Sequence, residues 1–289
     1  MSAGRFAPSP SGDLHVGNLR TALLAWLCAR SSGRRIVLRV DDLDRVRPGA
    51  ELRQLDDLAA LGLDWDGPVV HQSQRARYYD AALASLGGRG LVYECFCTRR
   101  EIQEAPSAPH APPGSYPGTC RDLSGSERDA RRRERPAALR LRADVREHTV
   151  DDVLHGTVTG VVDDVVLRRG DGVVAYNLAT VVDDAQQGVD QVVRGDDLLS
   201  SAPRQAHLAT LLGTTPPTYV HVPLALNADG ARLAKRDGPV TRAELAERGV
   251  DVLAMIADSL GLVGATPVEM LDGFDVTRIP REPWVVTPG

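Results

Sequence analysis

The sequence predicts an α/β protein built around a parallel sheet. In the first third of the chain, segments with strand character alternate with amphipathic helical segments, and turn-forming residues separate them. Strand, helix, strand, helix in succession is typical of parallel strands joined by right-handed crossovers. At 289 residues, of which 43% are hydrophobic and 25% charged, the chain can bury one large core or two modest ones.

The first predicted unit begins at Arg5. A short apolar start is followed by a run of Pro, Ser and Gly, and then His15 and Gly17 open an amphipathic segment over residues 19–29. This order predicts a strand, a tight loop and a helix, with His15 and backbone N–H groups at a helix N-terminus, where phosphate is favoured. Phosphate chemistry is the first functional hypothesis. Taken alone, a histidine at a helix start is more often a cap or a surface residue.

A second strand is predicted over residues 34–40, which end in the acidic run DDLD at 41–44. Ligands collect at the carboxyl ends of strands in open α/β sheets, so these carboxylates can face a substrate. A capping and turn cluster is an equal alternative. Helical spacing follows over residues 51–61 and 75–86, and the turn residues at 62–68 predict a loop between them.

The second half of the chain contains shorter elements. Strands are expected over residues 137–141, 161–169 and 219–223, with a hairpin turn at 170–172. Helices are expected near 204–212 and over 251–260. The nearly continuous apolar run at 173–182 indicates a buried parallel strand leading into a helix.

The region from residue 95 to about 135 has no long apolar period, and prolines crowd residues 105–117. Such a region needs something other than a hydrophobic core to hold it. Cys95, Cys97 and Cys120 could supply three thiolates to Zn²⁺, which prefers four tetrahedral ligands. The C-x-C pattern with a distant third cysteine is weaker than paired CxxC motifs, and unbound thiols are the alternative.

Spacing leaves the fourth ligand open among His110, Tyr116 and Asp122. Imidazole is the usual choice by chemistry. Four protein ligands would leave no open position on the ion, which favours a structural role over a catalytic one.

Composition narrows the class of protein. No run of about 18 apolar residues appears, and the N-terminus lacks a basic-then-apolar leader, so we expect a cytoplasmic protein that does not span a membrane. The formal charge of −5 argues against a generally basic nucleic-acid binder. A net negative charge is still compatible with a local basic face, for which residues 131–135 are one candidate. A solvated helix face explains these charged residues equally well. Four cysteines are few for a disulfide scaffold, and Cys28 fits a packed core position.

Three separated blocks carry a family resemblance. RFAPSPSGDLHVGNLRTAL at 5–23, LRVDDLD at 38–44 and RLAKR at 232–236 resemble the signature blocks of the class I glutamyl-tRNA synthetases, in that family's order. The resemblance is closest to the shortened members, the glutamyl-Q tRNA(Asp) synthetases, and covers roughly residues 4–240.

The resemblance implies a class I synthetase fold. It implies a Rossmann-type catalytic domain with a parallel sheet in two halves, an inserted zinc-containing α+β subdomain and a short helical C-terminal segment without an anticodon-binding domain. The corresponding ranges are 1–94 and 170–239 for the two halves, 95–169 for the insertion and 240–289 for the C-terminal segment.

The activity implied by the resemblance is ATP-dependent activation of glutamate without tRNA, with Mg²⁺ accompanying ATP. The glutamyl group is then transferred to the queuosine base of tRNA(Asp), and we expect a monomer. Two alternatives stay open. One is an inactive paralogue that binds tRNA or a partner as a regulator, and the other is a small-molecule adenylyltransferase, whose HxGN/H motif is similar to residues 15–18.

The resemblance also assigns residues. The catalytic pair is His15 and Lys235, the only lysine in the chain. Glutamate would contact Arg5, Ala7, Ser9, Asp41, Tyr176 and Arg194, with Asp41 on the ammonium and Arg5 or Arg194 on the side-chain carboxylate. ATP would contact Pro8, His15, Gly17, Asn18, Leu233 and Lys235. Zinc would be held by Cys95, Cys97, Tyr116 and Cys120, because the family has a Tyr four residues before its third Cys, and His110 is the rival of Tyr116.

Three positions depart from the family pattern. Asp41 stands where Glu is usual, which shortens the carboxylate by one methylene and can loosen the ammonium contact. Asn18 replaces the final residue of the first block, and Ala234 replaces a small hydroxyl residue before Lys235. A lost hydroxyl contact is usually worth about 0.5 to 1.5 kcal/mol.

Overall fold

A computed structural model describes residues 2–104, 116–233 and 240–286. Its core is a seven-stranded sheet in the order β3-β2-β1-β9-β10-β6-β7, in which all neighbours are parallel except the antiparallel pair β6 and β7. The strands are β1 (Ala3–Phe6), β2 (Arg35–Val40), β3 (Val70–His71), β6 (Glu147–Asp152), β7 (Gly156–Val161), β9 (Val189–Gly195) and β10 (Thr218–Val222). The predicted α/β class with a mostly parallel central sheet is confirmed.

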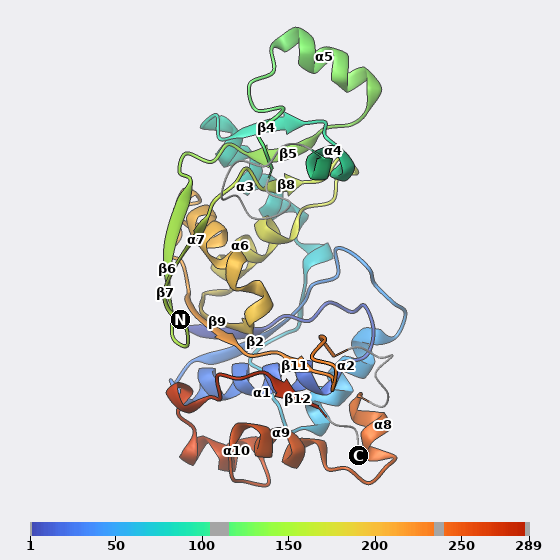
Figure 1. Ribbon diagram of the computed structural model, residues 1–289, viewed down its shortest axis with the longest axis vertical. Helices are drawn as coiled ribbons and strands as arrows, with labels where there is room; N and C mark the ends of the chain where they lie inside the picture. The colour runs from blue at the N-terminus through green and yellow to red at the C-terminus, as the bar shows by residue number, and fades with distance from the viewer. Residues whose placement is uncertain (1, 105–115, 234–239, 287–289) are drawn as a thin grey trace.

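Helices cover both faces of this sheet. Figure 1 shows α1, α9 and α10 on one side of β2 and β9, and α6 and α7 on the other. Neighbouring side chains of a strand point to opposite faces. Accordingly Ile36 and Leu38 pack in the core that includes α1 and α9, whereas Val37 packs with Val192 and with Ala206 of α7. The sheet is therefore buried on both faces, as parallel sheets require.

The helices vary in length. They are α1 (Val16–Ser31), α2 (Ala50–Ala60), α3 (Ala76–Gly88), α4 (Arg99–Glu104), α5 (Gly125–Glu134), α6 (Tyr176–Gln187), α7 (Ala202–Leu211), α8 (Arg242–Ala246), α9 (Val252–Leu260) and α10 (Pro267–Met270). Short 3-10 turns are η1 (Gln72–Gln74), η2 (Asp196–Ser201), η4 (Leu271–Gly273) and η5 (Val276–Arg278). In the part of the chain that the structure describes, no helix combines the length and the apolar character needed to cross a membrane.

A second, smaller sheet lies at one end of the molecule (Figure 1). It pairs β4 (Val92–Cys95), β5 (Ala138–Leu141) and β8 (Val166–Arg168) in antiparallel fashion. Its apolar side joins a core with α3, α6 and α7. Helix α5 buries no residue and projects at the far end of the long axis.

The C-terminal residues return to the N-terminal half. Strand β12 (Trp284–Val285) pairs with β11 (Ala225–Leu226), and Ile256 and Ile279 enter the same core as α1. Helix α1 is therefore enclosed between the large sheet and the C-terminal helices.

Most elements predicted from the sequence are present. The helices expected over 51–61, 75–86, 204–212 and 251–260 appear as α2, α3, α7 and α9, with ends displaced by at most two residues. The strands expected over 34–40, 137–141 and 219–223 appear as β2, β5 and β10. The turn at 170–172 is also confirmed, because Gly172 has φ +87° and the Arg169 N–H donates to the carbonyl of Val173.

The apolar run at 173–182 was predicted as a buried parallel strand leading into a helix; the helix is confirmed, but the parallel strand is wrong. Only Val174 forms a single antiparallel bridge, with Arg168, and α6 begins at Tyr176. A short apolar run cannot be assigned to strand or helix from its pattern alone, because a helix buried on most sides is as apolar as a buried strand. The strand expected over 161–169 is limited to residues 166–168, and the β6–β7 hairpin was not predicted.

Candidate functional site

His15 is the N-cap residue of α1. Its Nδ1 accepts the backbone N–H of Asn18 at 3.2 Å, and the Asn18 side-chain oxygen accepts the His15 N–H at 3.2 Å, a reciprocal capping box. Because Nδ1 is an acceptor, the neutral imidazole carries its proton on Nε2. Burial, followed by the positive charge of Arg232, lowers the pKa of His15 to about 4. The ring is therefore a neutral N–H donor at pH 7.

Gly17 allows a close approach between α1 and β11. A Cβ atom at this position would lie 2.6 Å from the Cβ of Ala225 and 3.0 Å from Nδ1 of His15. A side chain would therefore displace either the strand or the imidazole.

The segment around RLAKR returns to the same helix terminus. At its start, the N–H of Leu233 donates to the carbonyl of Ala225 at 3.2 Å. After it, the N–H of Val16 donates to the carbonyl of Val240 at 2.8 Å, and His15 forms an isolated bridge with Thr241. Both flanks are thus attached beside the N-terminus of α1.

Lys235 and Ala234 lie outside the described residues. Next to them, Arg232 pairs with Asp197 at 2.7 Å, and its charge acts on His15. The described flanks therefore place the third sequence block next to the first.

Three of the residues assigned to glutamate lie in or directly after neighbouring parallel strands. Arg5 is in β1, Asp41 follows β2 and Arg194 is near the end of β9, and each is at most 8% exposed. Nε of Arg39 donates to Oδ1 of Asp41 at 2.8 Å. Burial raises the pKa of the Asp41 carboxyl, although Arg39 opposes this effect.

Tyr176 lies at the start of α6 with 44% of its surface exposed, and it is close enough to Arg5 to interact electrostatically. The charges of Arg39 and Arg194 also act on Arg5, in the opposite direction, and lower its pKa, so the structure brings these residues together.

The loop that leaves β1 is attached to the carboxyl end of β2. The carbonyl of Pro8 accepts the N–H of Asp41 at 3.0 Å, and the carbonyl of Ser9 accepts the buried Gln54 amide at 3.0 Å. Ala7 is partly buried and Ser9 is exposed. The loop residues assigned to glutamate and ATP therefore border the same strand ends.

A buried charge network beneath these residues was not predicted. Arg39 is fully buried and pairs with Asp41, with Asp184 at 2.6 Å and with Asp183 at 3.8 Å. Arg75 also pairs with Asp183, at 2.5 Å. Unpaired buried charges are costly, so this pairing indicates a fixed scaffold below the strand ends. The sequence does contain a sign of this network: Arg39 lies between apolar neighbours within β2, which indicates a buried charge that needs a partner.

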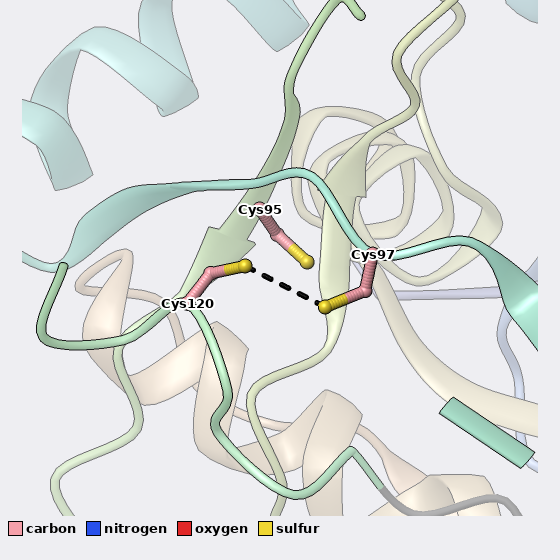
Figure 2. Close-up of side chains that lie close together, drawn as sticks. All are labelled: Cys95, Cys97 and Cys120. Carbon is pink, nitrogen blue, oxygen red and sulfur yellow. Dashed lines mark hydrogen bonds between the residues drawn. The ribbon is translucent and has the colours of Figure 1, made fainter. Parts of the chain in front are cut away.

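A cluster of three thiols lies where β4 ends (Figure 2). The Sγ atoms of Cys95, Cys97 and Cys120 all lie within 4.8 Å of one another, and those of Cys97 and Cys120 are 3.5 Å apart. A tetrahedral ion with bonds of about 2.3 Å to sulfur would separate its ligands by about 3.8 Å. The three cysteines are therefore spaced so that they could hold a metal ion.

Tyr116 also belongs to the cluster. Its hydroxyl lies 3.3 Å from Sγ of Cys95 and 3.8 Å from Sγ of Cys97, and it accepts the N–H of Cys120. By contrast, the Asp122 carboxylate is exposed and accepts from Arg142 at 2.9 Å. His110 lies outside the described residues. Of the two candidates among the described residues, Tyr116 is the one that lies beside the thiols.

Comparison with known proteins gives consistent matches. The family described as tRNA synthetases class I (E and Q), catalytic domain, matches residues 3–281. A relative from Nocardia farcinica named glutamyl-Q tRNA(Asp) synthetase is 67% identical over 99% of this chain and 93% of its own length. A relative of the same name from Cutibacterium acnes is 51% identical over 96% of this chain and 81% of its own.

A solved structure shares the fold. The crystal structure of a glutamate tRNA ligase from Elizabethkingia meningosepticum, in complex with its amino acid, superposes with a TM-score of 0.83 at 26% identity. The match covers all of this chain and 67% of that one.

Proposed function

Because the chain belongs to the glutamyl-Q tRNA(Asp) synthetases, ligases of the class I (E and Q) synthetase family, we propose that it activates glutamate with ATP in the absence of tRNA. A carboxylate oxygen of glutamate attacks the α-phosphorus of ATP, which forms glutamyl-adenylate and releases pyrophosphate. A hydroxyl of the queuosine base of tRNA(Asp) then attacks the glutamyl carbonyl, which forms an ester and releases AMP and a proton. The observation that carries the proposal is that the residues on either side of 234–239 hydrogen-bond beside His15 and Gly17, at the N-terminus of α1.

The glutamate site in this proposal uses the strand ends. Asp41 would accept the ammonium through Oδ2, because its Oδ1 accepts from Arg39. Arg5 or Arg194 would hold the side-chain carboxylate, and Tyr176 would cover it from the exposed side. Ala7 and Ser9 would line the loop side. The Asp41 side chain is one methylene shorter than the Glu that is usual in the family. Its hydrogen bond to the buried Arg39 restricts it to one orientation, which favours an amino acid of one side-chain length.

The ATP site uses the start of α1. His15 would donate its Nε2–H to a phosphate oxygen. The backbone of the first turn, at Gly17 and Asn18, would attract the phosphate through the partial positive charge of the helix N-terminus. Pro8 and Leu233 would contact the nucleotide, and Lys235 would place a cation on the leaving pyrophosphate. Mg²⁺ bound with ATP would neutralise further phosphate charge. Positioning and charge neutralisation account for most of the catalysis in this reaction class.

We also propose that the thiol cluster holds one structural zinc ion. Cys95, Cys97, Cys120 and Tyr116 would complete a four-ligand shell without an open position. The mixture of soft thiolates with one oxygen suits zinc better than a hard cation.

ATP/pyrophosphate exchange without tRNA tests the first half-reaction. We expect exchange with glutamate and not with the other nineteen amino acids. Lys235→Ala should lower the exchange rate by about 10² to 10³ with little change in the KM for glutamate, because the ammonium acts on the leaving group. Arg278→Ala, which removes an exposed cation whose ion pair among the described residues is with Asp275, is the control.

Two results would contradict these assignments. An equal loss of rate and glutamate affinity in Lys235→Ala would remove the role given to Lys235. Exchange that is absent from the unmodified protein, both with and without tRNA, would favour an inert paralogue.

A further inference from the structure

Arg194 is held by a chain of buried polar residues that crosses three neighbouring strands. Nε of Arg194 in β9 lies 3.0 Å from Nε2 of His221 in β10. Nδ1 of the same imidazole lies 2.7 Å from Oδ2 of Asp152, at the end of β6. The side chains of His221 and Asp152 are fully buried, and Arg194 is 5% exposed.

The chemistry of the three groups determines where the protons lie. The Nε–H of an arginine can only donate, so Nε2 of His221 must accept. A neutral imidazole has a single N–H, which is then on Nδ1 and is donated to Asp152. Asp152 also accepts three backbone N–H groups, from His221 at 3.0 Å and from Leu154 and His155 at 2.9 Å. Asp152 is therefore a fixed acceptor that selects one tautomer of His221.

The remaining contacts of Arg194 complete its orientation. Nη1 donates to Oε1 of Gln205 at 2.7 Å, and Nη2 donates to the carbonyl of Leu198 at 3.4 Å. Gln205 is itself fixed by Asn177 at 2.9 Å. One N–H on each terminal nitrogen is left over, and two such donors match a carboxylate bidentately.

Arg194 also differs from the other two buried arginines of the site. Arg5 and Arg39 both face the carboxylate of Asp184, whereas no ion pair among the described residues includes Arg194. Its direct partners are an imidazole, an amide and a carbonyl, and its guanidinium lies 5.5 Å from the ring centre of Tyr219. A buried cation with neutral partners only is suited to an anionic ligand.

From this geometry we propose that Asp152 and His221 are positioning residues. Asp152 fixes one tautomer of His221, and His221 orients Arg194. The remaining N–H groups of Arg194 can then bind the side-chain carboxylate of the glutamate substrate. The inference rests on the proposed function for the identity of the ligand. The orientation of Arg194 itself does not depend on it.

Protonation of His221 would break this arrangement. Nε2 would become a donor that faces the Nε–H of Arg194. The groups that face the ring are Arg194, Asp152, His155, Asp196 and Tyr219, whose ring stacks on it at 5.7 Å. Burial, and then the charge of Arg194, lower the pKa of His221 against the opposing effect of Asp152. We expect the KM for glutamate to rise as the pH falls below the range in which this imidazole is neutral.

Two substitutions of His221 separate orientation from packing. Asn can replace Nδ1–H toward Asp152 but offers no acceptor to Arg194, whereas Gln can place its oxygen near the former Nε2. We expect His221→Asn to raise the KM for glutamate at least about tenfold with kcat changed by less than about threefold. His221→Gln should recover most of the affinity.

The matched control is His207→Gln. His207 is a buried imidazole that pairs with Asp144 at 2.9 Å and lies against the ring of His148. The His207→Gln substitution should leave the KM for glutamate unchanged. Equal KM effects of His221→Asn and His221→Gln, or an unchanged KM in His221→Asn, would overturn the proposal.

A second measurement does not depend on activity. Long-range ¹H–¹⁵N spectra of the histidine rings should show His221 as the Nδ1–H tautomer at pH 7, assigned by its absence in His221→Gln. An Nε2–H tautomer or a charged imidazolium would overturn the positioning of Arg194 by His221 and Asp152, even in an active enzyme. An inactive enzyme with the Nδ1–H tautomer would overturn the proposed function but support this positioning of Arg194.

Discussion

At the scale of single residues, His15 combines two roles that depend on opposite nitrogens of one ring. Nδ1 caps α1, and this leaves Nε2–H as the donor. Asn18, a departure from the family pattern, completes the capping box that holds the ring. The departure therefore has a structural explanation in this chain.

The low pKa of His15 predicts a specific pH dependence of stability. The pKa in the folded protein is about 4, against 6.5 for an unperturbed imidazole. As the pH falls below 6.5 the unfolded chain takes up a proton first, so the free energy of unfolding decreases until the pH is below 4. The full effect is on the order of 3 kcal/mol.

Comparison with His15→Asn isolates this contribution, because Asn is a good N-cap that does not titrate. Denaturant unfolding of both proteins should show a smaller loss of stability between pH 7 and pH 4 in His15→Asn. Identical pH profiles would mean that the His15 imidazole is accessible to protons in the folded state.

Short sequence motifs identified some of the candidate site residues but missed the polar residues buried within apolar strands. His15, Asp41 and the cysteines were selected from short motifs. Arg39 and His221 were not selected, although each interrupts an apolar strand. Apart from Asp41, two residues after Arg39, their partners lie on other strands or on a helix, and these long-range contacts cannot be seen in the sequence.

At the scale of elements, the thiol cluster joins β4 to the turn that contains Cys120. Its small core contains Tyr93 and Phe96 besides the thiols and Tyr116. A core of this size gives limited hydrophobic stabilisation, and the proposed ion would add to it.

Metal analysis tests the zinc proposal. Purified protein should contain about one zinc ion per chain, and Cys120→Ser should lose most of it. Cys28→Ala is the matched control, because Cys28 is a buried thiol inside α1 and belongs to a different core. A strong chelator should lower the unfolding temperature of the unmodified protein but have little effect on Cys120→Ser. A metal-free protein with the same unfolding temperature would exclude a structural ion.

Helix α6 shows why part of its apolar run was predicted wrongly as a strand. Leu178, Ala179, Val181 and Val182 are all buried, because α6 packs against the small sheet and against α7. Asp183 and Asp184 are buried as well, and their charges are paired with arginines from β2 and from the residue before α3. Only these contacts account for two adjacent acidic residues in an apolar helix.

At the scale of the whole molecule, segments from both halves of the chain meet around α1. The C-terminal helices α9 and α10 pack against α1, which also packs against β1, β2 and β9 of the large sheet. At the other end of the long axis, the small sheet and α5 extend away from α1. The molecule thus separates the proposed site from a projecting region.

The acceptor of the second half-reaction can be tested with tRNA(Asp) whose 3′-terminal ribose lacks the hydroxyl groups needed for ordinary aminoacylation. We expect labelled glutamate to be transferred to such a tRNA when it contains queuosine, because the cyclopentenediol hydroxyls are still available. The matched control is the same tRNA without queuosine, which should accept none.

Periodate treatment provides a further control. It cleaves the vicinal diol of queuosine and should abolish transfer. Equal labelling of tRNA with and without queuosine, lost in both when the 3′ end is blocked, would identify ordinary aminoacylation instead.

The sequence by itself determined the fold class, most helices and strands, the family and the residues that stand in its motifs. These follow from local patterns, because hydrophobic periodicity and turn residues act over a few positions. Only the tertiary structure decided that Asp183 and Asp184 pair with buried arginines, and that His221 and Asp152 link to Arg194. Such features depend on groups that are far apart in the chain and meet in a buried environment, where the free-energy cost of an unpaired polar atom selects the partner.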